Sequence, residues 1–282
     1  MHGAEPKATG DPGPASEAHP AAPPILSVVL LTRNEAARLP DALAGVGWAE
    51  DLLVFDSEST DATPEVARRA GARVVSRRFT DFADQRNAAL REARGEWVFF
   101  LDADERVSVE LAAELQARAA DPGGHDGFDV PRKNYLGARW LRHGGLYPDY
   151  QLRLVRRDGA RFVGAVHERA RLPGPIGRLQ HPLTHHTYAD REDLRRKVVH
   201  YAALEGKMHA AQGTSLARLL LRAPYRLLRT LVLRSGWRDG ADGWIHAWAQ
   251  WRYAWIVCAT VRRERRRPSG AATQEDACAS RK

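Results

Sequence analysis

The chain has 282 residues, of which 44% are hydrophobic and 28% are charged, and this is the composition of an ordinary globular protein. Its net charge is +8, from 43 basic and 35 acidic residues, and a dense basic block occupies residues 262–267. The two cysteines form neither a metal-binding spacing nor a disulfide framework, which favours a reducing compartment. No uninterrupted run of about 20 apolar residues occurs, so the sequence predicts no membrane-spanning helix.

Both ends of the chain are expected to be disordered. Residues 1–24 are rich in Ala, Pro and Gly and lack the apolar stretch of a signal peptide. Residues 268–282 are predicted to form a disordered tail. The ordered part is expected to divide into residues 25–188 and a helical extension at 189–267.

Residues 25–101 alternate between apolar runs and helical patterns. Strands are expected at 25–31, 51–55, 74–75 and 97–101. A first helix is expected to open in segment 32–35 and to run to about residue 46, and two more are expected at 63–70 and 82–93. Gly71 and Gly95 are expected to end the second and third of these helices. Three such alternations favour an α/β fold with a parallel sheet of right-handed βαβ units.

The strand at 97–101 is the centre of the predicted site. Its five apolar residues indicate burial on both faces, so Asp102 and Asp104 must lie at or beyond its carboxyl end. Two carboxylates at that edge are suited to a divalent cation that holds phosphates. The alternative is an acidic cap, with Asp104 or Glu105 starting the next helix.

Two other predicted strands also end in polar residues, at 32–35 and 56–61. In a parallel sheet these ends share one edge with 102–105 and form a crevice rich in carboxylates. The sequence contains no glycine-rich phosphate loop, which disfavours a dinucleotide fold and a P-loop enzyme. Phosphate is therefore expected to be held by a cation at Asp102 and Asp104 and by arginine.

The second half of the chain has a different pattern. A helix is expected at 109–119, short mixed or antiparallel strands at 128–166, and a last strand at 183–188. Helices are then expected at 193–209, at 215–233 with a kink or break at Pro224, and at 244–263. The last helix carries five aromatic residues and ends in arginines. Between residues 218 and 234, five arginines recur at helical spacing beside leucines. Both patterns predict an anionic membrane surface as a partner. The alternative is a helix packed on the catalytic part with a solvated basic end.

Several segments together resemble the family 2 glycosyltransferases, which have the GT-A fold. They are 27–35 (SVVLLTRNE), 54–63 (VFDSESTDAT), 84–87 (DQRN) and 100–105 (FLDADE). Segments 147–154, 166–169 and 185–188 are similar to those of bacterial enzymes that add glucose to the lipopolysaccharide inner core. The resemblance covers about residues 25–262. The segments together are specific for the family, but they are much less specific for the sugar and the acceptor.

The resemblance implies roles for individual residues. Asp102 would face ribose or metal-bound water, while Asp104 would bind Mg²⁺ or Mn²⁺ directly, with His185 as a further metal ligand. The other residues of the nucleotide-sugar site would be Thr32, Asn34, Glu35, Asp56, Asp84 and Arg86. Three of these residues have alternative roles. Asn34 could cap a helix, Arg86 could be a surface residue, and His185 could have a structural role.

The catalytic base of an inverting transfer must lie outside the Asp102/Asp104 pair, because metal occupies those carboxylates. Glu168 is the favoured candidate and Asp149 the second. The alternative for Glu168 is an ion pair with Arg169 or Arg171. Arg153 and Arg156 are expected to meet diphosphate or an anionic acceptor, or else to be solvated strand residues.

The expected activity is an inverting, metal-dependent transfer of a hexose, with UDP-glucose as the expected donor, onto a lipopolysaccharide inner core or related glycolipid. The expected place is the inner face of the cytoplasmic membrane. An alternative is a family 2 transferase for polyprenyl phosphate or a capsule or exopolysaccharide acceptor, and another is an inactive scaffold. Nucleic acid is not an expected partner, because no nucleic-acid-binding motif accompanies the basic block.

Overall fold

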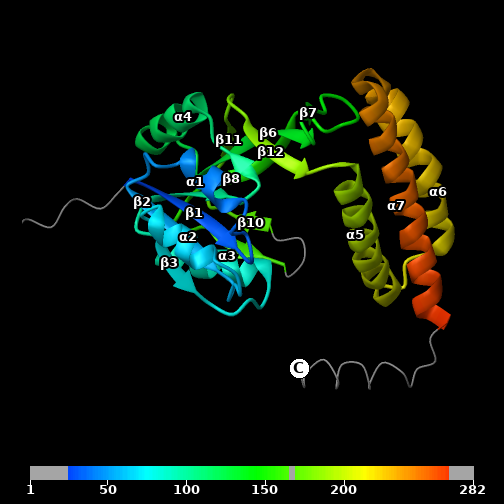
Figure 1. Ribbon diagram of the computed structural model, residues 1–282, viewed down its shortest axis with the longest axis horizontal. Helices are drawn as coiled ribbons and strands as arrows, with labels where there is room; N and C mark the ends of the chain where they lie inside the picture. The colour runs from blue at the N-terminus through cyan, green and yellow to red at the C-terminus, as the bar shows by residue number, and fades with distance from the viewer. Residues whose placement is uncertain (1–24, 165–168, 267–282) are drawn as a thin grey trace, which may run out of the picture.

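A mixed β-sheet is the centre of the structure, a computed structural model that describes residues 25–164 and 169–266 (Figure 1). The first strands are β1 (Leu26–Thr32), β2 (Asp51–Asp56), β3 (Arg73–Ser76), β4 (Trp97–Leu101) and β5 (Glu105–Arg106). The helices of this region are α1 (Leu39–Ala44), α2 (Thr63–Arg69), α3 (Phe82–Glu92) and α4 (Val109–Ala120).

The later strands are β6 (Gly127–Leu136), β7 (Arg139–Trp140), β8 (Asp149–Arg156), β9 (Arg161–Val163), β10 (Arg169–Arg171), β11 (Ile176–Arg178) and β12 (Leu183–Tyr188). The later helices are α5 (Arg191–Ala211), α6 (Leu216–Leu228), the π-helix η1 (Arg229–Leu233), the 3-10 helix η2 (Gly236–Asp239) and α7 (Gly240–Arg266). The strands of the main sheet follow the order β3-β2-β1-β4-β8-β6-β12-β5.

The sheet has a parallel half and a mixed half. β1 is parallel to β2 and β4, and β2 is parallel to β3, as predicted. β8 then runs antiparallel to both β4 and β6, and β12 is parallel to β6. This confirms the expected mixed addition after residue 128.

β4 is buried on both faces, as its apolar run predicted. Trp97, Phe99 and Leu101 pack with residues of α1, α2 and α4, while Val98 and Phe100 pack with residues of α3 on the opposite face. Each of these five side chains is at most 1% exposed. Burying a large apolar side chain contributes about 1.5–3 kcal/mol, so β4 anchors the sheet edge where the acidic residues follow.

The prediction of a helix from segment 32–35 to about 46 was wrong in its start. Asn34 adopts a left-handed backbone conformation (φ +56°), which an α-helix cannot continue through. The helix α1 begins at Leu39, where Pro40 fits the first turn. The preceding residues are free to form a loop at the carboxyl edge of the sheet.

Two further expectations are corrected. Glu105 does not start a helix: its side chain is fully buried, and the Ser108 side chain caps α4 by accepting a hydrogen bond from the Leu111 amide (3.2 Å). Pro224 does not end its helix: α6 runs through it to Leu228 and continues as the π-helix η1.

The three C-terminal helices form a layer beside the sheet, with α7 packed against both α5 and α6 (Figure 1). Asp239 ties this layer to the loop before β8 by accepting hydrogen bonds from the His143 amide and from Nδ1 of His143, each 2.8 Å. None of the helices in residues 25–164 and 169–266 combines the length and apolar content that crossing a membrane requires. The predicted leader and tail lie outside the described residues.

Candidate functional site

The carboxyl ends of β1, β2 and β4 lie along one edge of the sheet. Thr32 at the end of β1 is in register with Asp56 at the end of β2, and Leu30 of β1 is in register with Leu101, the last residue of β4. The polar segments that follow the three strands therefore meet at one edge, as the parallel topology required.

Hydrogen bonds join the loops after β1 and β2. The backbone amide of Asn34 donates to Oγ of Ser59 (2.8 Å), and Oδ1 of Asn34 accepts from the Thr60 amide (2.8 Å). The Glu35 amide donates to Oγ1 of Thr63 (2.8 Å). Asn34 thus connects two loops instead of capping a helix.

Asp56 is 1% exposed and is held by donors from both loops. Its Oδ1 accepts from Oγ1 of Thr32 (3.1 Å) and from Oγ of Ser59 (2.5 Å), and its Oδ2 accepts from the Ser59 amide (2.8 Å). These bonds fix the carboxylate at the edge of the sheet where the sequence predicted the nucleotide.

Asp102 lies at the end of β4 and pairs with a buried arginine from β8. Nη2 of Arg153 is 2.5 Å from Oδ2 of Asp102 and 2.5 Å from Oε1 of Glu105. Burial works to raise the pKa of the Asp102 carboxyl, but Arg153, helped by Arg86, holds that pKa well below its usual range. Asp102 is therefore an anion with a fixed orientation.

Arg153 is the residue whose importance the sequence did not settle. It is 4% exposed, so the solvated alternative is wrong for it, whereas Arg156 remains partly exposed near Glu96 (3.3 Å) and Asp126 (3.5 Å). The available signal was its position between Leu152 and Leu154. The pairing of β8 with β4, which buries it, is a tertiary property.

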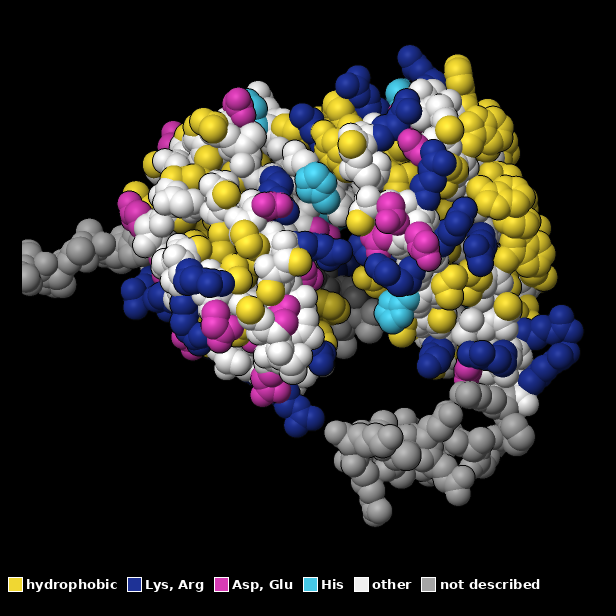
Figure 2. All heavy atoms as spheres, viewed as in Figure 1, with side chains coloured by type: hydrophobic (Ala, Val, Ile, Leu, Met, Phe, Trp, Pro, Cys, Tyr) yellow, Lys and Arg dark blue, Asp and Glu magenta, His cyan; other side chains and the backbone are white. Residues whose placement is uncertain are grey.

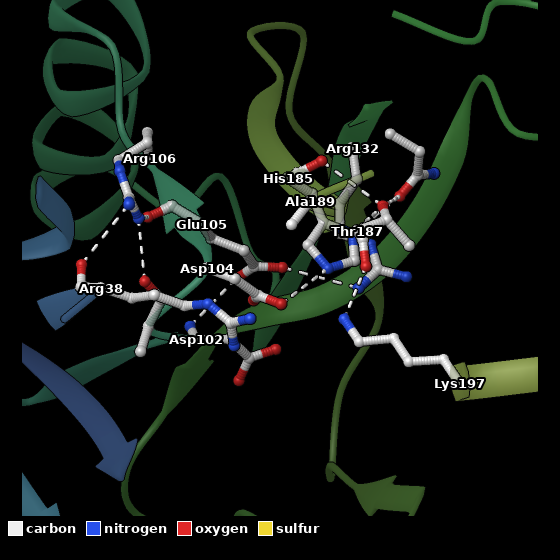
Figure 3. A network of polar contacts seen from close by, with 12 residues as sticks. Arg38, Asp102, Asp104, Glu105, Arg106, Arg132, His185, Thr187, Ala189 and Lys197 are labelled. Atoms are coloured by element: carbon white, nitrogen blue, oxygen red, sulfur yellow. Dashed lines mark hydrogen bonds and ion pairs between the residues drawn. The ribbon is translucent and has the colours of Figure 1, made fainter. Parts of the chain in front are cut away.

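A second arginine continues the network away from Asp102 (Figure 3). Nη1 of Arg132 is 3.5 Å from Oε1 of Glu105, and Nη2 of Arg132 is 2.6 Å from Oδ2 of Asp149. Asp149 also accepts from Gln151 (2.9 Å) and from Nδ2 of Asn134 (3.3 Å). Burial favours a higher pKa for Asp149, but Arg132 and these donors lower it.

Asn134 and His185 carry the network to Asp104. Nδ1 of His185 is 2.7 Å from Oδ1 of Asn134, and Nε2 of His185 is 3.5 Å from Oδ2 of Asp104 (Figure 3). The Asn134 amide orientation follows from its Nδ2, which faces the Leu146 carbonyl (2.9 Å). Nδ1 of His185 therefore donates to Oδ1 of Asn134, and its Nε2 faces Asp104.

These contacts form a nearly closed loop, which we call the polar ring. In order its members are Asp102, Arg153, Glu105, Arg132, Asp149, Asn134, His185 and Asp104. The ring begins and ends in the segment after β4, so the mixed half of the sheet positions both acidic residues of the predicted pair. Sequence reasoning missed Arg132 and Asn134, which had no recognisable motif.

Three other predicted residues, Glu35, Arg86 and Asp84, differ in their surroundings. Burial raises the pKa of Glu35 against the opposing charge of Arg38, and the charge of Asp104 adds to the rise, which places Glu35 near the acidic pair. The Arg86 guanidinium lies 4.8 Å from the centre of the Phe100 ring. Asp84 faces Arg77 instead (2.9 Å), so it supports the loop after β3.

The described part of the chain, residues 25–164 and 169–266, contains no group of three or more His, Cys, Asp or Glu side chains arranged to hold a metal ion. The predicted set of Asp102, Asp104 and His185 is only partly assembled: Asp104 and His185 face each other, while Asp102 is turned to Arg153. Glu168, the favoured base, lies outside the described residues.

The chain is similar to known proteins both as a family and as individual relatives. The sequence profile described as Glycosyl transferase family 2 matches residues 27–171. The lipopolysaccharide core biosynthesis glycosyltransferase LpsC of Rhizobium meliloti is 27% identical over 84% of this chain and 91% of its own length. An uncharacterized glycosyltransferase of Rickettsia bellii is 37% identical over 32% of this chain, which spans only 31% of that relative.

Among solved structures, the chain is similar to glucosyl-3-phosphoglycerate synthase of Mycobacterium tuberculosis in complex with Mn²⁺, UDP and phosphoglyceric acid. The TM-score is 0.35 and the identity is 26%, over 39% of this chain and 44% of that one. The family profile covers more than half of the 282 residues. This chain therefore belongs to glycosyltransferase family 2 and is a glycosyltransferase with the GT-A fold.

Proposed function

We propose that the protein is an inverting, metal-dependent hexosyltransferase that uses UDP-glucose and acts on a lipopolysaccharide inner core or related glycolipid. The observation that carries the proposal is the convergence of Asp104 and His185, held by Asn134, at the edge where the strand ends meet. The catalytic part would be residues 25–188, with a helical extension at 189–267.

The pair Asp104 and His185 fits Mg²⁺ or Mn²⁺. Nε2 of His185 and Oδ2 of Asp104 face each other across 3.5 Å, and an imidazole nitrogen and a carboxylate oxygen can both bind a divalent cation. Asn134 orients the histidine from its other nitrogen, as second-shell groups do in metal sites. Two protein ligands leave positions for diphosphate oxygens, as is usual for Mg²⁺. A bound divalent cation would offset charge on the leaving diphosphate.

The remaining residues of the crevice would bind and orient the donor. Asp56 and Asn34 would define the nucleotide pocket through the loops they fix, with Thr32 supporting Asp56. Asp102, already an anion, would accept a hydrogen bond from ribose or from metal-bound water. Arg86 would lie by the diphosphate, where its positive charge attracts phosphate oxygens.

The second candidate base, Asp149, is a poor proton acceptor. It is paired with Arg132 at 2.6 Å, and this contact with its other donors lowers its pKa. Glu168 therefore remains the proposed base. Replacing Glu168 with Gln should abolish sugar transfer while the protein stays folded, and near-normal turnover would remove it from this role.

The acceptor and the membrane surface are the less constrained parts of the proposal. LpsC, which is similar over most of both chains, is named for lipopolysaccharide core biosynthesis. The basic and aromatic helices at 189–267 suit an anionic surface, so we place the enzyme at the inner face of the cytoplasmic membrane. Polyprenyl phosphate or a capsule glycan remains the alternative acceptor.

The deciding experiment measures UDP release from UDP-glucose, UDP-galactose and UDP-N-acetylglucosamine with Mg²⁺, with Mn²⁺ and with EDTA. Metal-dependent release from UDP-glucose is the expected result. Asp104→Asn is the matched variant, because it keeps the shape of the side chain and removes the charge. It should reduce the metal-dependent release. Failure of every nucleotide sugar to bind or react with either metal would refute the proposal.

A further inference from the structure

Helix α6 and the π-helix η1 present an apolar stripe to solvent. Leu221 is 72% exposed, Leu233 is 67% and Leu228 is 52%, and they are joined by Leu220, Tyr225 and Val232. Leu219, Ala223 and Thr230, which are buried, lie about half a helical turn away from Leu221 and Leu228. Among the described residues, the segment therefore packs one face against α7 and leaves a second apolar face exposed to solvent.

The segment that carries the stripe has charges of one sign. From Ser215 to Ser235 the sequence has no Asp or Glu, and its arginines are Arg218, Arg222, Arg226, Arg229 and Arg234. Figure 2 shows hydrophobic side chains gathered on the side of the molecule that α6 and α7 form, with Lys and Arg side chains around them. Arg222 and Arg226 lie 4.0 Å and 3.9 Å from Glu205 of α5, so the charge available to a partner comes from the remaining arginines. An apolar stripe with arginines beside it matches a surface with hydrocarbon below and negative charge above.

We propose that α6 and η1 lie in the plane of an anionic lipid leaflet, with the stripe buried among the acyl chains and arginines at the phosphates. This inference rests on the proposed glycolipid acceptor and names the surface that meets its membrane. It also moves the interfacial role from the tryptophan-rich last helix to α6. The helix α7 packs against both α5 and α6, and its residues Val257, Cys258 and Val261 are buried with Leu219 of α6.

The test is flotation of the full-length protein with phosphatidylcholine vesicles, with and without phosphatidylglycerol. The wild type should float with the mixed vesicles, and high salt should release it. Leu221→Ser/Leu228→Ser should weaken this binding about tenfold or more. The matched control is Trp244→Ser/Trp255→Ser on α7, whose side chains are also exposed (58% and 44%) and which should bind within about threefold of wild type.

A second pair tests the charge. Arg218→Gln/Arg229→Gln should abolish the preference for mixed over neutral vesicles while thermal unfolding stays unchanged. The proposal would be overturned if the wild type bound neutral and mixed vesicles equally. It would also be overturned if only Trp244→Ser/Trp255→Ser lost binding. A dimer that Leu221→Ser/Leu228→Ser converts to a monomer, without vesicle binding, would assign the stripe to a second copy. UDP release does not enter these outcomes, so failure of the proposed activity is recognised separately.

Discussion

Removing the Arg153 side chain should be among the most damaging single changes outside the apolar core. Arg153→Met keeps much of the side-chain volume but leaves the fully buried Glu105 with the more distant Arg132 (3.5 Å) and the Asp102 backbone amide (3.1 Å). Breaking a buried ion pair by deleting one partner costs about 3–5 kcal/mol. For a chain of this size that corresponds to a fall in Tm of about 6–20 °C.

The pH dependence identifies the cause of that loss. Burial already raises the pKa of Glu105 against the effect of Arg153, so removing the guanidinium should raise it further. A carboxyl whose pKa is higher in the folded than in the unfolded protein takes up a proton on folding. The folded protein then loses stability as pH rises above the pKa of this carboxyl in the unfolded protein, which is about 4.3. The deficit of Arg153→Met should therefore be larger at pH 8 than at pH 5.5.

The assay is thermal unfolding followed by circular dichroism at both pH values, with two further variants. Arg153→Met/Glu105→Gln removes both charges and should recover most of the loss, because an unpaired buried charge no longer exists. Arg156→Met, on the same strand but partly exposed, should change stability by less than about 1 kcal/mol. A deficit that is independent of pH and is not reduced by the second substitution would refute the reasoning.

Three other predictions follow from separate parts of the structure. Asp104→Asn should reduce metal-dependent UDP release on the order of 100-fold with little change in Tm, measured in parallel on the same samples. Asp51, buried and paired with Arg73 (2.8 Å), has a lowered pKa because that contact and other hydrogen bonds outweigh burial. The contribution of Asp51 to stability is present above the unfolded pKa of about 3.9 and is lost as pH falls through the folded value. Urea unfolding should therefore find Asp51→Asn about 2 kcal/mol less stable than wild type at pH 7, and nearly equal to it in acid. A Cβ at Gly95 would lie 2.5 Å from the Ser27 amide nitrogen, whereas one at Gly47 would meet nothing within 4 Å. Gly95→Ala should thus cost about 1–3 kcal/mol, and Gly47→Ala should be within about 0.5 kcal/mol of wild type.

The parallel half of the fold was predictable because its signals are local. An apolar run such as Trp97–Leu101 specifies a strand buried on two faces, and polar residues after three such runs must then meet at one edge. The same local reasoning failed at Glu105, where an acidic residue ahead of a helix is usually a cap. Here the strand β8 brings Arg153 to it, and this partner is distant in sequence.

The mixed half of the site was not predictable for a related reason. Asn134 bonds His185 across two strands that are 51 residues apart along the chain. Neither residue belongs to a periodic pattern that would indicate the contact, and the polar run around Asn134 is equally typical of a solvated strand. Register between β6 and β12 creates the pair, and register follows from how the whole sheet assembles.

The distribution of charge within the polar ring indicates where a cation would bind. Asp102 and Glu105 share Arg153, and Glu105 and Asp149 share Arg132, so these three carboxylates are partly offset by two guanidiniums. Among the described residues, the ion-pair partner of Asp104 is His185, whose Nδ1 proton is committed to Asn134. Like charges held this close are unfavourable unless a positive group offsets them. The four carboxylates of the ring outnumber its two guanidiniums, and among the described residues no guanidinium contacts Asp104. A cation at that end would therefore stabilise the ring as well as the leaving diphosphate.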